Sequence, residues 1–164
     1  MTVRAERPDD FEAIDEIVSA AFLAEFGTTT EVELIRAMRE RRELVPELTL
    51  VAEDHERVVG HIAFSEVTLD GHAVRGLGLA PVAVAPNLQK SGIGSLLITT
   101  ALERAEHDGW CFVVVLGHPA YYPKFGFAPA AAFGLTGDYG DHDGWMVRSL
   151  AGAPVPSGHV RFCS

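Results

Sequence analysis

The sequence contains little cysteine, few basic residues and no long apolar run. Its two cysteines, Cys111 and Cys163, form no C-x-x-C pair and imply no disulfide framework. This usage fits a reducing compartment, so we expect a cytoplasmic protein. The first ten residues are polar and contain no signal-peptide core, and no apolar stretch reaches the length that a membrane-spanning helix needs.

The balance of charge disfavours two further classes of partner. Lysine and arginine number 13 against 23 aspartates and glutamates, which gives a formal net charge of −10. Nucleic acids and anionic membrane surfaces both attract basic residues, so we expect neither as a partner. A cationic substrate would suit this charge. Many acidic proteins are simply soluble, however, so the charge has little weight in choosing a substrate.

Length and composition predict one globular domain over residues 1–164. A chain of this length can bury a sizeable core. Its content of 48% hydrophobic and 22% charged residues is ordinary for a soluble globular protein. The sequence contains no internal repeat and no linker that would separate a second domain.

The stretch from Val82 to Ser95 is the most informative part of the sequence. An apolar strand pattern ends at a proline, and Gln-x-x-Gly-x-Gly, with Gly92 and Gly94, then opens an amphipathic helix that extends to about His107. Glycines admit a ligand close to the main chain, and the first N–H groups of a helix have no partner within it. With the helix dipole, they favour a phosphate or pyrophosphate. The alternative is an ordinary glycine-bearing loop between a strand and a helix.

Two familiar phosphate-binding motifs are absent from this stretch. A Walker loop needs G-x-x-x-x-G-K-[ST], whereas Lys90 precedes both glycines. The dinucleotide fingerprint G-x-G-x-x-G also fails, because Ser95, Leu96 and Leu97 follow Gly94. The stretch therefore belongs to neither of these classes.

Hydrophobic periodicity and turn signals predict strands and helices on both sides of this stretch. Strands are expected at residues 2–6, 48–53, 58–69, 73–84, 112–116, 145–150 and 158–163, and helices at 8–22, 31–41 and 91–107.

Within the central region the pattern predicts a right-handed βαβ unit. Residues 112–116 form an apolar run typical of a buried parallel strand. Gly76 and Gly78 interrupt the strand pattern at 73–84, which indicates a bulge or a close approach of the backbone. The residues of the 91–107 helix that we expect to face the sheet are Ile93, Leu96, Leu97, Ala101 and Ala105.

Two motifs resemble those of one enzyme superfamily. Residues 82–97, V-A-V-A-P-N-L-Q-K-S-G-I-G-S-L-L, resemble motif A of the GNAT superfamily of acetyl-CoA-dependent N-acetyltransferases. Tyr-x-Lys-x-Gly-Phe at 122–127 resembles the Y-E-K-L-G-F signature of its motif B. The matched region spans residues 73–130, about a third of the chain, and is most similar to small stand-alone bacterial members.

The resemblance implies a fold and an activity. The fold is α/β (α+β), the GNAT fold, with a mixed central sheet of about six to seven strands, a splayed fourth and fifth strand, and about four helices. The activity is transfer of an acetyl group from acetyl-CoA, the cosubstrate, to a primary amine of a small molecule or peptide, by direct attack on the thioester. The alternative is a non-catalytic acyl-CoA-binding, sensing or protein-interaction module on the same fold. The resemblance leaves open whether the protein forms a homodimer.

The resemblance also implies which residues contact the cofactor. The main chain of the strand would pair with the pantetheine arm, and an amide near Val82 is the candidate oxyanion donor. Amides at the helix entrance would hold the pyrophosphate, and Gln89 would fix the loop. Lys90 either touches a phosphate or is a solvated lysine. The cofactor-binding candidates are Val82, Ala83, Val84, Gln89, Lys90, Ser91, Gly92, Ile93, Gly94, Ser95 and Tyr122.

Two residues are candidates for catalysis. Tyr122 matches the family tyrosine that often protonates the departing thiolate, although an aromatic that packs on the core or the cofactor is the alternative. His118 follows the predicted strand 112–116 and could relay a proton, or could simply be exposed. The family often has Asn in the following loop or Glu at the end of that strand. Here the loop reads Gly-His-Pro-Ala and Gly117 ends the strand, so the base is unassigned, with Glu66 a weaker candidate.

No other cluster predicts a site. Asp138, Asp141, His142 and Asp143 have no regular metal-loop spacing and indicate a surface turn, so no metal is expected. The acceptor is not identified by any motif. The loops at 23–30 and 134–144 are the candidates for the walls of its pocket. The remaining histidines, scattered along the chain, support no site: His55, His61, His72, His107 and His159.

Overall fold

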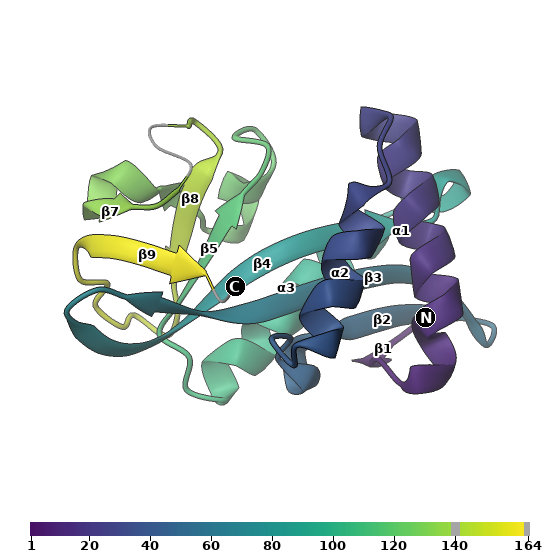
Figure 1. The fold of residues 1–164 in the computed structure, drawn as a ribbon, viewed down its shortest axis with the longest axis horizontal. Coiled ribbons are helices and arrows are strands. Elements are labelled where there is room, and N and C mark those ends of the chain that lie inside the picture. The colour runs from purple at the N-terminus through teal and green to yellow at the C-terminus, as the bar shows by residue number, and fades with distance from the viewer. Residues whose placement is uncertain (139–141, 163–164) are drawn as a thin grey trace. The chain divides into compact units, whose positions relative to one another are not determined.

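The structure is a computed structural model that describes residues 1–138 and 142–162. Within these residues the chain forms three α-helices and nine strands (Figure 1). The helices are α1 (Phe11–Phe26), α2 (Thr30–Glu40) and α3 (Ile93–His107). The strands are β1 (Thr2–Ala5), β2 (Leu50–Asp54), β3 (Arg57–Leu69), β4 (His72–Val84), β5 (Phe112–Leu116), β6 (Ala128–Pro129), β7 (Leu135–Thr136), β8 (Trp145–Ser149) and β9 (Gly158–Phe162).

The chain divides into two compact units. The first comprises residues 1–64 and 81–101, and the second comprises residues 65–80 and 102–164. Strands β3 and β4 and helix α3 each contribute residues to both units. The expectation of one domain over residues 1–164 stays a prediction.

In the first unit, two helices pack against an antiparallel sheet. Strand β2 pairs with β1 and with the first part of β3. Helices α1 and α2 lie side by side over these strands (Figure 1). Gly27 ends α1 in a left-handed conformation, with φ of 69°, which a glycine adopts without strain. The shared core consists of Ile14, Ile17, Val18, Ala21, Val32, Ile35, Val51 and Ala83.

In the second unit, parallel and antiparallel pairs form a mixed sheet. Residues Gly76–Leu79 of β4 pair in parallel with residues 112–115 of β5. Strand β5 pairs antiparallel with β8, and β8 pairs with β6. The end of β3 pairs with β9, and β9 pairs in parallel with β7. The core of this unit consists of Val67, Leu69, Phe112, Val114, Ala130, Leu135, Trp145, Val147 and Val160.

The architecture agrees with the predicted mixed α/β fold and differs in its counts. The βαβ unit is present, and the pairing of β4 with β5 ends at Leu79 while β4 continues to Val84, as expected of a splayed pair. In the described residues there are three α-helices instead of about four, because residues 122–125 form only a short 3₁₀ helix, η4. The two additional strands, β6 and β7, contain two residues each, too few for a periodic pattern.

Gly76 and Gly78 provide room for aromatic rings inside a continuous strand. A Cβ atom on Gly76 would lie 2.3 Å from Cζ of Phe112, and one on Gly78 would lie 2.7 Å from Cε1 of Phe162. Strand β4 runs without interruption from His72 to Val84. The close approach is therefore made by two aromatic side chains, and the predicted interruption of this strand is not present.

The prediction that Leu96 faces the sheet is wrong. Leu96 is 40% exposed, whereas Ile93, Leu97 and Ile98 are buried. Successive residues of a helix turn by roughly 100°, and the buried face is centred between Leu97 and Ile98. Leu96 therefore lies on the opposite side of the helix.

Candidate active site

A side chain and two backbone bonds fix the loop that joins β4 to α3. Ala85 N–H donates to the carbonyl of Val59 at 2.9 Å, which ties the end of β4 to β3. Residues Pro86–Leu88 form a 3₁₀ turn, in which Leu88 N–H donates to Ala85 at 2.8 Å. The side-chain amide of Gln89 then donates to the carbonyl of Val84 at 3.2 Å. Gln89 therefore holds the loop against the strand, as the sequence predicts.

The entrance of α3 has the local geometry of an anion-binding loop. Lys90 and Gly92 have left-handed φ angles of 64° and 91°. Gly92 directly precedes the helical Ile93, and a left-handed residue next to a helical one turns successive N–H groups toward one side. The first backbone bond of the helix runs from Leu96 N–H to the carbonyl of Gly92 at 3.0 Å. The N–H groups of residues 93–95 precede that bond and have no acceptor within the helix.

The first turn of α3 is held on β3 by a glycine contact. A Cβ atom on Gly60 would lie 3.0 Å from Cγ2 of Ile93 and 3.0 Å from Cδ1 of Leu97. Both apolar side chains are buried, whereas Lys90 and Gly92 are exposed. The helix entrance therefore has an anchored apolar side and an open polar side.

In the second unit, the segment after β5 carries Tyr122. The carbonyl of His118 accepts the N–H groups of Tyr121 at 3.0 Å and of Tyr122 at 3.3 Å, and so begins η4 (Tyr122–Phe125). The side chain of His118 is exposed. Tyr122 is only 8% exposed, and its ring lies against the end of β5, where a Cβ atom on Gly117 would be 2.3 Å from its Cε2. Its ring also meets Phe127 edge-on, with centroids 5.5 Å apart.

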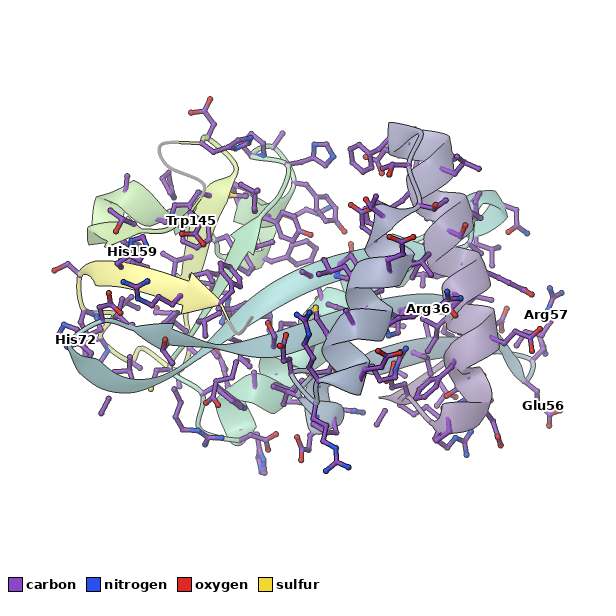
Figure 2. All side chains as sticks on the ribbon, viewed as in Figure 1. Arg36, Glu56, Arg57, His72, Trp145 and His159 are labelled. Carbon is purple, nitrogen blue, oxygen red and sulfur yellow. The ribbon has the colours of Figure 1, made fainter. Side chains whose placement is uncertain are left out.

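A cavity of about 350 Å³ lies in the second unit beside the start of β8. Its lining includes the buried Leu135 and Trp145 and the exposed His142 and Asp143. Gly117 N–H donates to the carbonyl of Gly144 at 3.0 Å. This hydrogen bond connects the residue that follows β5 to the segment between the lining residues Asp143 and Trp145. Figure 2 labels Trp145 of this cavity and His159, whose Nδ1 is 2.9 Å from Oγ1 of the lining residue Thr136.

The predicted site residues fall into two groups. Those of the cofactor loop, Val82–Val84 and 89–95, belong to the first unit, and His118 and Tyr122 belong to the second. Glu66 is an exposed residue of β3 in the second unit. Among residues 1–138 and 142–162 no cluster of acidic residues, histidine and cysteine could hold a metal ion. Asp141 and Cys163 lie outside the described residues.

A buried polar cluster in the first unit has no counterpart in the sequence analysis. Glu6 Oε1 lies 2.9 Å from Nε2 of the fully buried His61 and 2.9 Å from Nη2 of Arg39. Burial raises the pKa of Glu6, but the hydrogen bonds from His61 and Arg39 outweigh it and hold the pKa of Glu6 below its ordinary value. The cluster joins the residue that follows β1 to α2 and β3. Arg39 and His61 lie 33 and 55 residues from Glu6 in the sequence, so no local pattern predicts the cluster.

Arg148 of β8 is another residue that the sequence analysis does not single out. Its Nε–H donates to the carbonyl of Phe125 at 2.7 Å, and its Nη1–H donates to Oε1 of Glu106 at 2.9 Å. The three residues that precede it in β8, Trp145, Met146 and Val147, are apolar. An arginine within a half-buried strand indicates a specific partner, but the pattern alone does not identify that partner.

The fold and the loop together define a class of protein. A mixed sheet whose parallel strands are joined by a helix with an open, glycine-bearing entrance is the arrangement expected of the N-acetyltransferase fold. In the described part of the chain, no helix is both long and apolar enough to cross a membrane.

Comparisons with known proteins place the chain within this class. A family model for the acetyltransferase (GNAT) domain matches residues 2–130. The uncharacterised N-acetyltransferase YjhQ of Escherichia coli K12 is 38% identical over 144 residues, or 83% of this chain and 80% of that protein. The uncharacterised N-acetyltransferase YhbS of the same strain is 34% identical over 153 residues, or 92% of this chain and 88% of that protein.

Solved structures agree with the sequence comparisons. Escherichia coli YhbS in complex with CoA has a TM-score of 0.84 at 30% identity, over 99% of this chain and 89% of that one. A GNAT family acetyltransferase from Brucella melitensis in complex with acetyl-CoA has a TM-score of 0.83 at 32% identity, over 99% and 96%. The chain belongs to the GNAT family of acetyltransferases, which confirms the family predicted from motifs A and B.

Proposed function

We propose that this protein transfers the acetyl group of acetyl-CoA to a primary amine of a small molecule or peptide, by direct attack of the amine on the thioester. The entrance of α3 carries the proposal, because its left-handed Lys90 and Gly92 precede amides that have no acceptor within the helix. The complexes of two relatives with CoA and acetyl-CoA, at 30% and 32% identity, support the same ligand.

The cofactor-binding roles follow from this loop. The N–H groups of residues 90–95 hold the pyrophosphate, with the exposed Lys90 ammonium as an additional positive charge. The main chain of Val82, Ala83 and Val84 pairs with the pantetheine arm along the part of β4 beyond its pairing with β5. An N–H group near Val82 donates to the oxyanion, and a preorganised donor of this kind contributes about 3–4 kcal/mol to lowering the barrier.

The reaction consists of one addition and one elimination. The neutral amine attacks the thioester carbonyl carbon with its lone pair, which forms the C–N bond and places a negative charge on the oxygen. Collapse of this intermediate breaks the C–S bond and releases the CoA thiolate. Tyr122 donates its phenolic proton to the thiolate and regains a proton from solvent. The proton lost by the nitrogen passes to His118 or directly to water.

The cavity beside β8 supports a cationic acceptor. Its apolar lining residues Leu135 and Trp145 and its exposed Asp143 suit an apolar body that carries an ammonium group. Five of its lining residues, Gly134, Leu135, Thr136, His142 and Asp143, belong to the loop that the sequence suggests for the acceptor. The net charge of −10 favours the same sign of ligand.

Calorimetry and thiol release test the proposal. We expect CoA to bind and to raise Tm by mass action. We also expect acetyl-CoA to release thiol with at least one member of a panel of polyamines, aminoglycosides, amino acids and peptides. Tyr122→Phe should lower kcat by about 100-fold while the Kd of CoA changes less than about threefold. A flat titration would refute the loop assignment, and CoA binding without thiol release across the panel would favour a sensing module.

A further inference from the structure

Arg148 bridges two elements of the second unit. Its Nε–H donates to the carbonyl of Phe125, the last residue of η4, at 2.7 Å. Its Nη1–H donates to Glu106 of α3 at 2.9 Å and to the carbonyl of Ser149 at 3.3 Å. The guanidinium group is planar and keeps its donors in a fixed fork, so it holds these partners in one geometry.

The bond to Phe125 bears on Tyr122, because both residues belong to the same four-residue helix. So short a 3₁₀ helix has little stability of its own, and its last carbonyls have no partner within it. At its start, η4 is held by the carbonyl of His118 and by packing of the Tyr122 ring on Gly117. At its end, it is held by Arg148. The direction of the helix, and with it the direction of the phenol, depends on both ends.

The turn after η4 is built to admit the arginine. Gly126 follows the helix with a left-handed φ of 91°, and its N–H donates to the carbonyl of Pro123 at 3.0 Å. A Cβ atom on Gly126 would lie 3.0 Å from Nε of Arg148 and 3.5 Å from its Cδ. The side chain of Arg148 therefore lies directly on the turn, in space that a larger residue at 126 would occupy.

Glu106 limits the freedom of the guanidinium group. Its Oε1 accepts from Arg148 and also from Ala151 N–H at 3.2 Å. The pKa of Glu106 lies below its ordinary value, mainly because of the hydrogen bond from Arg148 and to a smaller extent because of that from Ala151. The carboxylate is therefore ionised at neutral pH. The two side chains are 26% and 35% exposed, so the pair orients Arg148 more than it stabilises the fold.

From these contacts we infer that Arg148 is a positioning residue for the acetyl transfer, which aims the phenol of Tyr122 by holding the far end of η4. This inference rests on the proposed function, since it assigns Arg148 a role through the proposed acid. Arg148 itself contacts neither substrate nor cofactor in this scheme.

Kinetics of four variants test the inference. Arg148→Met should lower kcat about tenfold, with the KM for acetyl-CoA and the Kd of CoA changed less than about threefold, because misplacing a reacting group slows the reaction without removing the binding loop. Arg148→Lys should recover part of kcat, since an ammonium can still donate to Phe125. Glu106→Gln should lower kcat about threefold. The matched control Arg161→Met removes an exposed arginine that pairs with Asp70 at 2.8 Å, and should leave kcat unchanged.

A double variant separates positioning from general damage. If Arg148 acts through Tyr122, the variant with both Arg148→Met and Tyr122→Phe should be no slower than Tyr122→Phe alone. Losses that multiply in the double variant would overturn the inference. So would a wild-type kcat in Arg148→Met, or a loss of kcat in Arg161→Met as large as that in Arg148→Met.

A spectroscopic readout keeps the inference testable if no acceptor is found. With ¹³C label on the phenolic carbon, the three tyrosines of the chain give three signals, and Tyr122→Phe identifies one of them. Arg148→Met, or Glu106→Gln if the former does not fold, should shift that signal. An unshifted signal would overturn the positioning role. An inactive wild type would instead refute the proposed function and leave this readout to decide whether Arg148 orients Tyr122. A fully active Tyr122→Phe would overturn the acid role of Tyr122 and, with it, this inference.

Discussion

The buried cluster around Glu6 allows the effect of a single charge to be worked out. Glu6, with a side chain 11% exposed, accepts hydrogen bonds from Arg39 at 2.9 and 3.1 Å and from Nε2 of His61 at 2.9 Å. In Glu6→Gln the carboxylate becomes an amide with one oxygen and one NH₂ group. Because the surrounding groups are donors, the NH₂ group must face at least one of them, and that donor loses its partner.

The size of the effect follows from burial and charge. A hydrogen bond to a charged group contributes about 1.5–3 kcal/mol, and removing one partner of a buried ion pair costs about 3–5 kcal/mol. Arg39 remains 18% exposed and keeps some contact with water, so we expect a loss of about 2–4 kcal/mol in the free energy of unfolding at pH 7. For a chain of this length, that lowers Tm by about 4–16 °C.

The effect should also depend on pH. The pKa of Glu6 is lower in the folded state, so its contribution to stability is fully present above the unfolded pKa of about 4.3. It is lost as pH falls through the folded pKa. The stability of the wild type and of Glu6→Gln should therefore converge as pH falls below about 4.

Urea unfolding at several pH values measures both quantities. Asp15→Asn is the matched control, because Asp15 accepts from Arg36 at 2.8 Å in an exposed pair between α1 and α2 (Figure 2 labels Arg36), and should cost less than about 1 kcal/mol. A loss in Glu6→Gln no larger than in Asp15→Asn would refute the argument. So would a difference from wild type that stays constant between pH 7 and pH 3.

Two glycine substitutions test the candidate site. Gly117→Ala places a Cβ atom 2.3 Å from Cε2 of Tyr122, so the ring must move. In the thiol-release assay kcat should fall about tenfold, while the Kd of CoA stays nearly constant. An unchanged kcat would contradict the role of Tyr122. Gly92→Ala forces an L-residue to φ of 91°, which costs about 1–2 kcal/mol and distorts the loop. Calorimetry should then show the Kd of CoA raised about 5- to 30-fold. An unchanged Kd would contradict the assignment of the loop to CoA binding.

Local signals account for the part of the fold that the sequence predicts. The apolar run 112–116 and the glycine pattern at 92–94 each depend on neighbouring residues, and the structure has β5 and the start of α3 there. The family prediction likewise rests on two local motifs, A at 82–97 and B at 122–127. Its catalytic assignments to His118 and Tyr122 stay predictions.

Contacts between distant residues account for what the sequence does not predict. No sequence motif surrounds His61, and its hydrogen-bond partner Glu6 lies 55 residues away in the sequence. Arg148 meets Phe125 and Glu106, which are 23 and 42 residues away, so strand periodicity does not identify them. Leu96 follows Ile93 by three residues, a spacing that places two residues near the same face of a helix. The side of the helix that is buried depends on the position of the sheet, which the spacing does not give.

The pairing of Gly76 with Phe112 implies that these two positions change together in related proteins. The ring of Phe112 occupies the space above Gly76 that a side chain would take, so the two residues divide one fixed volume. A relative with alanine or valine at the first position should have a smaller residue at the second. An alignment of many relatives should therefore show compensating sizes at 76 and 112, and also at 78 and 162, where the ring of Phe162 meets Gly78.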